Sequence, residues 1–380
     1  MGKEKNKKII IATGIFPPDI GGPATYSLLL VSELKKVGKN VIVVTYSDDD
    51  KEYDFKVNRI SRKQNIFLRY LKYFYIVFRN ADFNSVIYAQ DPISSGIPAY
   101  FASLLKGSKF FLKIVGDYAW EQGSIRAGVA ESIEDFQKKK YGFFVSLMKF
   151  IERFVAKRAN LVVTPSEFLK KIVNSWGVKE DKINVILNSY DSKNTTSCKT
   201  KDAGKIVLVS VGRLVPWKGF FELIDVISDI LKEDKDVILN IIGDGPDKVI
   251  IKEKIKSLKL ENFIFLKGKL SRDEVFCELK NSDIFILNTR YEGFSHILLE
   301  AMDAGLPIIT TNICGNPEVI KDQETGILID LGNKEALKYA ILKLKENSEL
   351  RNKLSKNAKK SLVYFSKEIM IKKTFDALNI

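Results

Sequence analysis

The feature of this chain that most constrains its fold is a repeated alternation of short β-branched segments and helical patterns. The first segment, KIIIAT, ends in a Pro/Gly-rich stretch, which is followed by a helical pattern through Leu34 and by a second segment, NVIVVTY. The same order recurs at SVIYAQ and KFFLKIV, and again at NLVVTPS and INVILN. Strands that alternate with helices predict a parallel sheet with crossover helices. The expected fold class is therefore α/β.

A second α/β series begins after a polar segment, and the 380 residues are enough for two domains. Its predicted strands are KIVLVSVG, VILNIIGDG, NFIFLKG, DIFILN and PIITT, with helices around Phe220 to Leu231, Lys248 to Leu258 and Ser271 to Lys280. The predicted organisation is an N-terminal Rossmann-like domain at 1–190, a linker at 191–204, a C-terminal Rossmann-like domain at 205–365 and a final helix at 366–380. Because the final helix follows a completed domain, it is free to pack back on the first one.

Composition excludes several classes of protein. Hydrophobic residues make up 45% and charged residues 28%, which is typical of a globular chain. The three cysteines form no CxxC pair, and His296 is the only histidine. These counts argue against a disulfide framework, most zinc sites and most Ser-His-Asp mechanisms. We expect no metal and no cofactor.

The positive charge is concentrated in the N-terminal half. Residues 1–190 carry +11 and the remainder carries +3, which together give the net charge of +14. This asymmetry indicates an anionic partner for the first half. The basic start of the chain lacks the apolar core of a signal peptide, and no stretch offers about 18 uncharged apolar residues. We therefore expect a cytoplasmic protein that does not span the membrane.

Loops that follow strands contain the first candidate site residues, because ligands of open parallel sheets bind beyond the carboxyl ends of the strands. Gly21 and Gly22 precede a helix, where bare amides could meet a phosphate; a tight turn is the alternative. Arg213 and Lys218, in VGRLVPWKGF, could clamp a diphosphate or remain solvated. Gly243, in GDGP, lies in another turn that exposes its backbone.

The most informative segment is NTRYEGFSHILLEAMDAGLPIITTNICGNPEVI. Ser295 is predicted to cap a helix from about His296 to Ala304, and Gly305 to end it. Glu292 then lies in the loop before the helix and Glu300 inside it. Glu300 has apolar neighbours, so its carboxylate must find donors; a ribose diol would supply two. A glutamate that faces solvent is the alternative.

Together, GIFPPDIGGPATY, VGRLVPWKGF, IIGDGP, EGFSHILLEAMDAGLPIIT, GNPEVI and TGILI resemble the retaining glycosyltransferases of family 4, also called glycosyl transferases group 1. The resemblance spans nearly the whole chain. It implies a GT-B fold, with two Rossmann-like domains that face each other across a cleft and a last helix that crosses back. It also implies transfer of a hexose from a nucleotide-diphosphate sugar to a glycan or a polyprenyl- or lipid-linked acceptor, in cell-surface polysaccharide or glycolipid synthesis.

The resemblance also assigns roles to single residues. It implies that Arg213 and Lys218 bind the diphosphate, that Glu300 holds the ribose hydroxyls and that Glu292 touches the donor sugar. Catalysis would then depend on Arg213, Lys218, Glu292 and Asp117. The further residues expected to bind the donor are Gly21, Gly22, Gly243, Phe294, Ser295 and His296. Arginine and lysine would replace the divalent ion of metal-dependent transferases.

One departure from the family pattern concerns the stretch KIVGDYAWEQG, where many members have a histidine beside the donor sugar. Gly116 and Asp117 occupy that position here. Asp117 is either part of the active site or a structural turn aspartate, and a weakened enzyme is a further possibility. The role of Asn188, in a turn similar to the family's NGxD, stays open. The string Asp48 to Asp50 resembles a metal-binding DxD motif but is interpreted as a solvated loop.

Two basic segments of the first half point to a membrane surface. Between Asp54 and Asp82 no acidic residue occurs, and the helical pattern NIFLRYLKYFYIVFRN mixes apolar and basic residues. Residues 138–158 form a second such segment. Helices that simply pack on the sheet would explain the apolar residues, whereas the cationic ones favour peripheral binding to an anionic membrane.

Three other functions are compatible with the sequence. One is a GT-B-fold nucleotide-sugar 2-epimerase, and another is a catalytically weakened, membrane-associated binding protein. The third is a nucleic-acid-binding protein, but no RRM, KH or helix-turn-helix signature is visible and no nucleic acid is expected as a partner.

Overall fold

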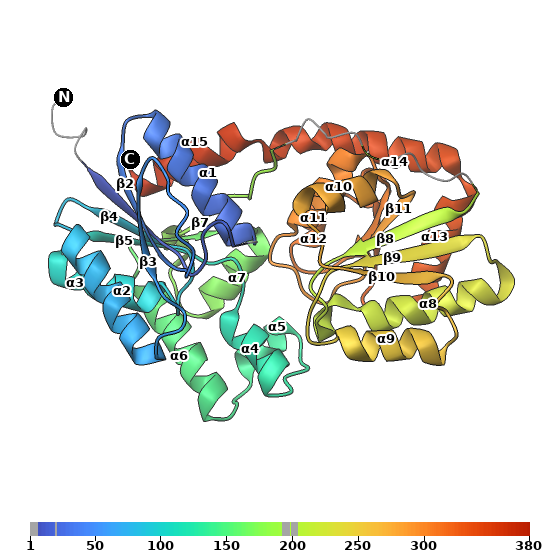
Figure 1. The fold of residues 1–380 in the computed structure, drawn as a ribbon, viewed down its shortest axis with the longest axis horizontal. Helices are drawn as coiled ribbons and strands as arrows, with labels where there is room; N and C mark the ends of the chain where they lie inside the picture. Colours follow the sequence, from blue (N-terminus) through green and yellow to red (C-terminus); the bar gives the residue numbers. More distant parts are fainter. Residues whose placement is uncertain (1–6, 20, 192–197, 199–203) are drawn as a thin grey trace. The chain divides into compact units, whose positions relative to one another are not determined.

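The computed structural model describes residues 7–19, 21–191, 198 and 204–380, which form two compact units (Figure 1). Unit 1 comprises Met1–Asn188 together with Glu368–Ile380, and unit 2 comprises Ser189–Lys367. The predicted linker at 191–204 lies outside the described residues except for Asp191, Cys198 and Gly204. The two units are both α/β, as the sequence pattern predicts.

Unit 1 is built on a seven-stranded parallel sheet in the order β3-β2-β1-β4-β5-β6-β7. Its strands are β1 (Lys8–Ala12), β2 (Asn40–Tyr46), β3 (Lys56–Ile60), β4 (Val86–Ala89), β5 (Lys109–Lys113), β6 (Leu161–Thr164) and β7 (Ile183–Val185). The predicted strands are confirmed, and β3 is additional. Because β3 is an edge strand that pairs with β2 alone and is mostly half-buried, its sequence KVNRI lacks the apolar run of a central strand.

Helices cover both faces of this sheet (Figure 1). They are α1 (Gly22–Lys36), α2 (Ile66–Asn80), α3 (Gly96–Lys106), α4 (Tyr118–Arg126), α5 (Ile133–Lys138), α6 (Phe143–Arg158), α7 (Glu167–Ser175) and α15 (Lys367–Leu378). The C-terminal helix α15 buries Met370, Ile371 and Leu378 in the core of unit 1, where α1 and the strands β1, β2 and β4 also contribute. The expectation that the last helix packs back on the first domain is confirmed.

A lysine lies inside the core of unit 1. Lys113, at the end of β5, is 1% exposed; its amine donates to Asn188 Oδ1 at 2.8 Å and lies 3.2 Å from the centre of the Tyr26 ring. Burial holds the pKa of Lys113 well below its ordinary value of 10.5. Asn188, whose role the sequence left open, is the last residue of the first segment of unit 1, and it satisfies the amine of a buried lysine.

This burial predicts a pH dependence of stability. The unfolded chain protonates Lys113 below about pH 10.4, whereas the folded chain favours the neutral amine, so stability should rise with pH up to the unfolded pKa. Between pH 7.5 and 9.5 the rise is expected to reach up to about 1.4 kcal/mol per pH unit. Urea unfolding at both pH values should show this rise in the wild type relative to Lys113→Met. Equal slopes in the two proteins would contradict it.

Unit 2 contains a six-stranded parallel sheet in the order β10-β9-β8-β11-β12-β13. The strands are β8 (Ile206–Val211), β9 (Val237–Ile242), β10 (Ile264–Gly268), β11 (Ile284–Leu287), β12 (Ile308–Thr311) and β13 (Ile327–Ile329). The five predicted strands are confirmed, and β13 extends the sheet. The order reverses between β8 and β11, and the carboxyl ends at such a switch point are where α/β sheets bind ligands.

The helices of unit 2 are α8 (Phe220–Glu233), α9 (Lys248–Ser257), α10 (Arg272–Lys280), α11 (His296–Ala304), α12 (Asn316–Val319), α13 (Lys334–Glu346) and α14 (Ser348–Ser361). The three helices predicted between the strands correspond to α8, α9 and α10 and agree with them within about two residues at each end. A disulfide joins Cys198 to Cys277 of α10, a pairing that the wide cysteine spacing did not indicate. Within the described part of the chain, none of the helices has the length and apolar character needed to cross a membrane.

Candidate active site

Backbone contacts bring together the loops that follow β8 and β9 in unit 2. The Gly212 amide donates to the Ile242 carbonyl at 3.0 Å, and the Leu214 amide donates to the Asp244 carbonyl at 3.0 Å. Gly243 has a φ of +144°, and a Cβ there would lie 1.9 Å from the Gly212 carbonyl oxygen. Only glycine fits this approach. Gly243 therefore fixes the position of the β8 loop, which carries Arg213.

The loop after β11 joins the same group. The Arg290 amide donates to the Trp217 carbonyl at 2.6 Å, and the Asn288 side chain donates to the Gly219 carbonyl at 3.2 Å. Gly219 has a φ of +62°, and a Cβ there would lie 1.9 Å from the Asn288 carbonyl oxygen. These contacts hold the short 3₁₀ helix η2 (Pro216–Lys218), and with it Lys218, against the β11 loop.

Two predicted site residues meet at this point. Lys218 Nζ forms an ion pair with Glu292 Oε1, and each side chain is 14% exposed. The Glu292 carbonyl also accepts a hydrogen bond from the Gly315 amide at 3.0 Å, which ties in the loop after β12. The pair is accessible enough for an incoming anion to compete with Glu292 for the lysine. The structure thus unites a cation and a carboxylate that are 74 positions apart in the chain.

Arg213 is placed differently from Lys218. Its side chain is exposed, and it has no ion-pair or hydrogen-bond partner among residues 7–19, 21–191, 198 and 204–380. The guanidinium carries five donors that suit a bidentate contact with phosphate. Arg213 is therefore a cation available to an anionic ligand at the carboxyl ends of β8 and β9.

Helix α11 begins at His296 and ends at Ala304, as predicted, and Gly305 follows with a φ of +81° in the left-handed region. The predicted side-chain cap is wrong. Ser295 occupies the cap position, but its hydroxyl bonds no amide of the first turn; the Oγ atom is buried, and no described residue bonds it. The start of α11 thus combines first-turn amides that lack intrahelical acceptors, the positive end of the helix dipole and the Ser295 hydroxyl, which has no partner among the described residues.

Phe294 and His296 lie at the edges of this helix start. Phe294 is buried, and its ring packs edge-on against the His296 ring at 6.0 Å and against Phe365 at 6.0 Å. Phe365 belongs to the 3₁₀ helix η3 (Leu362–Phe365). The aromatic contacts hold the segment before α11 in place, and the predicted roles of Phe294 and His296 in donor binding stay predictions.

Glu300 finds a donor within the protein. Its carboxylate lies 3.3 Å from the Arg272 Nε atom at the start of α10, and the side chain is 17% exposed. The sequence required a donor for this carboxylate but did not identify Arg272. A contact with ribose hydroxyls stays a prediction, and Arg272 would orient Glu300 for it.

A polar residue of the segment GNPEVI was not among the predicted site residues. Asn316 is fully buried; its side-chain amide donates to Thr310 Oγ1 at 3.0 Å and to the Thr311 carbonyl at 3.2 Å, while its Oδ1 atom has no partner among the described residues. It fastens helix α12 to the carboxyl end of β12. The motif contained the signal, because an asparagine before proline commonly marks a turn.

The remaining predicted site residues lie in unit 1. Gly21 precedes α1, and a Cβ on it would come within 2.9 Å of the Ile15 side chain; Gly22 is the first residue of α1. Asp117 is buried, caps α4 through the Trp120 amide at 2.7 Å and accepts from Gln137 Nε2 at 2.8 Å. These contacts favour the structural alternative for Asp117, and its catalytic role stays a prediction.

No group of three or more histidine, cysteine or acidic side chains that could hold a metal ion is present among the residues that the structure describes. Asp48 and Asp50, the first and last residues of the DxD-like string, are exposed, and Asp48 accepts a hydrogen bond from the Arg62 amide at 3.3 Å. The string is a surface turn of unit 1 after β2, as interpreted from the sequence.

The carboxyl edge of the unit 2 sheet thus gathers a loop with two cations, the Lys218–Glu292 ion pair and a helix start with a buried hydroxyl that has no partner among the described residues. Comparison with known proteins gives the family. Residues 20–194 match the model described as Glycosyltransferase Family 4, and residues 192–361 match the model described as Glycosyl transferases group 1. The chain therefore belongs to the group 1 / family 4 glycosyltransferases.

Individual relatives agree with this assignment. An uncharacterized glycosyltransferase of Methanocaldococcus jannaschii is 28% identical over 93% of both chains. The GPI3 subunit of the phosphatidylinositol N-acetylglucosaminyltransferase of Saccharomyces cerevisiae is 26% identical over 83% of this chain and 70% of its own length. The crystal structure of Anabaena HepE in complex with UDP and glucose covers 98% of this chain and 100% of its own, with a TM-score of 0.77 and 17% identity.

Proposed function

We propose that this chain is a retaining, metal-independent hexosyltransferase that binds a nucleotide-diphosphate sugar at the carboxyl edge of the unit 2 sheet. The observation that carries the proposal is the start of α11, where the buried Ser295 hydroxyl has no partner among the described residues and follows Glu292 of the Lys218 ion pair by three positions. A buried hydroxyl without a partner is costly unless a ligand satisfies it. A phosphate oxygen is the acceptor that suits a helix start.

The chemistry explains why cations gather here. As the bond from the sugar to the diphosphate breaks, negative charge grows on the leaving nucleoside diphosphate while the sugar becomes oxocarbenium-like. Lys218, Arg213 and the amides that begin α11 would stabilise that charge more strongly in the transition state than in the bound donor. Two fixed cations would do what a divalent ion does in metal-dependent transferases.

Glu292 and Glu300 would contact different parts of the donor. Glu292 would release Lys218 to the diphosphate and accept hydrogen bonds from hydroxyls of the transferred sugar. Glu300, oriented by Arg272, would accept the ribose hydroxyls. Each carboxylate already has a cationic neighbour in the protein, Lys218 for Glu292 and Arg272 for Glu300.

We further propose that unit 1 supplies the acceptor side and that the acceptor is a glycan or a polyprenyl- or lipid-linked molecule of cell-surface polysaccharide or glycolipid synthesis. The yeast relative named above acts on phosphatidylinositol, and HepE was crystallised with UDP and glucose. The HepE complex supports a nucleotide-diphosphate donor, and the name of the yeast relative supports transfer of a sugar to a lipid acceptor.

A thermal-shift panel tests donor binding. One of UDP, GDP and ADP, at ~100 times its dissociation constant, is expected to stabilise the wild type by about 2.7 kcal/mol. Arg213→Ala should weaken binding of that nucleotide by about ten- to a hundredfold, since a charge-assisted hydrogen bond is lost.

Lys334→Ala is the matched control for this panel, because Lys334 forms an ordinary surface pair with Asp225 at 2.8 Å on another part of unit 2. It should bind as the wild type does. No shift with any nucleotide would contradict the proposal. Nucleotide release that needs no acceptor would favour a 2-epimerase instead.

A further inference from the structure

One face of unit 1 exposes large apolar side chains on three neighbouring helices. Lys106 of α3 lies 4.0 Å from the centre of the Phe78 ring of α2, and Tyr100 of α3 packs against Phe154 of α6 with 5.8 Å between ring centres. Phe67 on α2 is 78% exposed and Phe143 on α6 is 83% exposed. Ten others on these helices are exposed: Ile66, Leu68, Leu71, Tyr75, Phe101, Leu104, Leu105, Phe144, Leu147 and Phe150.

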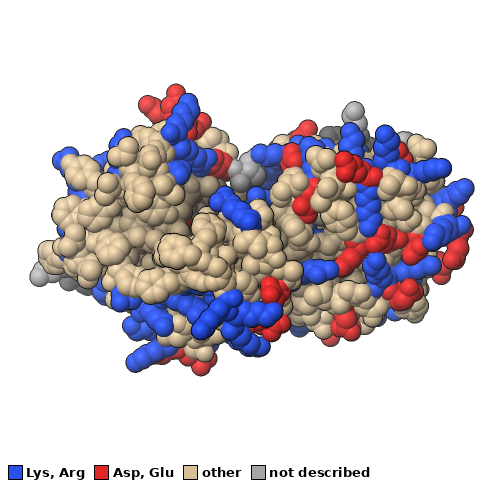
Figure 2. Space-filling model, turned by 90° about the horizontal axis from the view of Figure 1, so that it is seen from below, with Lys and Arg blue, Asp and Glu red and all other residues tan. Residues whose placement is uncertain are grey.

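The same helices present cations but no exposed acidic side chain. Helices α2 and α3 contain no aspartate or glutamate, and the acidic residue of α6, Glu152, is 1% exposed and turned into unit 1. The basic residues are Arg69, Lys72 and Arg79 on α2, Lys106 on α3, and Lys149, Arg153, Lys157 and Arg158 on α6. Figure 2, in which unit 1 is on the left, shows a broad neutral area with lysine and arginine gathered along its lower border.

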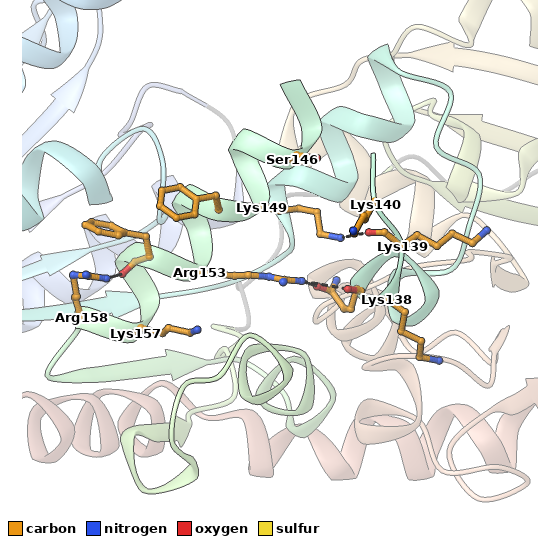
Figure 3. A pocket seen from close by; sticks show the side chains of 11 residues that line it. Lys138, Lys139, Lys140, Ser146, Lys149, Arg153, Lys157 and Arg158 are labelled. Atoms are coloured by element: carbon orange, nitrogen blue, oxygen red, sulfur yellow. Dashed lines mark hydrogen bonds between the residues drawn. The ribbon is translucent and has the colours of Figure 1, made fainter. Parts of the chain in front are cut away.

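A pocket of about 640 Å³ lies beside the apolar side chains of α6. Its cationic lining consists of Lys138 at the end of α5, of Lys139 and Lys140 after it, and of Lys149, Arg153, Lys157 and Arg158 on α6. No acidic residue lines the pocket, and outside the lining Asp135 pairs with Lys138 at 3.3 Å and Glu131 with Lys139 at 2.8 Å. Figure 3 shows Lys149 and Arg153 pointing from α6 toward the segment that carries the other three lysines. Phe150, one of the exposed apolar residues, also lines the pocket, so the apolar face and the cationic pocket are continuous.

Neutral groups hold the inner cations of this pocket. Lys149 Nζ donates to the Phe136 carbonyl at 2.6 Å and to the Lys139 carbonyl at 2.9 Å, and Arg153 donates to Gln137 Oε1 at 3.2 Å. Burial and the neighbouring Arg153 lower the pKa of Lys149, while the buried carboxylates Asp117 and Glu152 oppose that shift. An anion in the pocket would relieve the repulsion between these cations.

We propose that the face formed by α2, α3 and α6 docks on an anionic lipid bilayer, with its apolar side chains in the headgroup region and a lipid phosphate in the cationic pocket. This surface lies on unit 1 and does not depend on the donor site of unit 2. Aromatic and aliphatic side chains mixed with lysine and arginine are the composition of interfacial helices. An anionic bilayer suits both kinds of side chain, because its interior accepts the apolar ones and its negative surface attracts the lysines and arginines.

Other partners fit this face less well. A nucleic acid would use the cations and stack on some aromatic rings, but it would leave the aliphatic side chains Ile66, Leu68 and Leu71 in water. A second copy of the chain would bring the same cations face to face, because a symmetric dimer joins identical surfaces. Charge complementarity therefore favours the bilayer.

Co-sedimentation of the full chain with vesicles tests the proposal. The wild type is expected to bind vesicles of phosphatidylcholine with phosphatidylglycerol and to bind phosphatidylcholine vesicles far less. Lys140→Ala with Lys157→Ala should lower the partition coefficient about 25-fold, because each cation near an anionic surface contributes about fivefold. Phe143→Asp with Leu147→Asp should lower it by about a hundredfold or more, from the apolar area withdrawn.

The control is Val249→Asp with Lys252→Ala on α9 of unit 2, which combines one substitution of each kind, at an exposed apolar side chain and at an exposed lysine. It should bind vesicles as the wild type does. Wild-type binding to neither kind of vesicle, or equal binding by all variants, would overturn the proposal. So would binding to a DNA duplex that phosphatidylglycerol vesicles do not displace.

The nucleotide thermal shift separates this proposal from the proposed function. Variants on α6 should keep the shift of the wild type while losing vesicle binding, since they leave unit 2 unchanged. If the protein binds vesicles but shows no thermal shift with any nucleotide, the docking proposal is supported and the proposed donor site is contradicted.

Discussion

Lys218→Ala is expected to lower kcat/KM for transfer from the nucleotide sugar by about 10²–10³-fold, the usual effect of removing one preorganised group that stabilises charge in the transition state. Lys218 is held in place from two sides, by the ion pair with Glu292 and by the contacts that fix η2 against the β11 loop. Its loss should lower kcat as well as donor affinity, because negative charge grows on the diphosphate as the bond from the sugar to the diphosphate breaks. Steady-state kinetics with the donor identified by thermal shift provide the measurement.

Two comparisons make this result specific to the site. Lys334→Ala removes a lysine from an exposed pair with Asp225 and should leave kcat/KM within about twofold, as for an ordinary surface substitution. Glu292→Gln keeps the shape of the carboxylate but frees Lys218, so nucleotide binding should be kept or strengthened while turnover falls. Full activity of folded Lys218→Ala would remove the lysine from the proposed mechanism.

The fold was largely predictable because buried parallel strands read as nearly continuous apolar runs. Segments such as KIIIAT and NVIVVTY therefore located β1 and β2 within a residue. The strands that were missed, β3 and β13, lie at the edges of their sheets. β3 is mostly half-buried and retains polar residues in KVNRI, whereas β13 is apolar but only three residues long, too short to show a pattern.

The candidate site was predictable as a set of loops but not as a set of contacts. The carboxyl ends of strands pointed to Arg213, Lys218 and Glu292, yet the pairing of Lys218 with Glu292 depends on two loops from different strands. The Arg272 partner of Glu300 lies on another helix and has no local signature. Long-range side-chain pairs of this kind follow from packing, which periodicity does not encode.

Asp117 illustrates the same limit in unit 1. The family resemblance placed it where many members have a histidine and left a catalytic and a structural role open, while the structure surrounds it with Trp120, Gln137 and the nearby carboxylate of Glu152. Glu152 Oε1 accepts from the Tyr118 amide at 2.7 Å and Oε2 accepts from the Ala119 amide at 3.1 Å. A residue of α6 thus satisfies the first amides of α4, 33 or more positions away.

Glu152→Ala is expected to destabilise unit 1 by about 3–5 kcal/mol, because the buried Ala119 amide and the partly buried Tyr118 amide lose their acceptors and the cavity of the side chain remains. Urea unfolding at pH 7 gives the value. Glu134→Ala, an exposed glutamate on α5, is the control and should change stability by no more than about 0.5 kcal/mol. A loss below about 1 kcal/mol for Glu152→Ala would mean that water replaces the carboxylate at the start of α4.

The destabilisation caused by Glu152→Ala should depend on pH. Burial, and secondly the charge of Asp117, raise the pKa of Glu152 well above its ordinary 4.5. A carboxyl group with a raised folded-state pKa contributes most below its unfolded pKa, and the contribution falls as pH rises through the folded value. The difference between wild type and Glu152→Ala should therefore be larger at pH 5 than at pH 8. At neutral pH, burial of the Glu152 carboxylate therefore reduces the stability that this residue contributes. Burial also keeps the outer surface of α6 free of negative charge, as docking on an anionic bilayer requires.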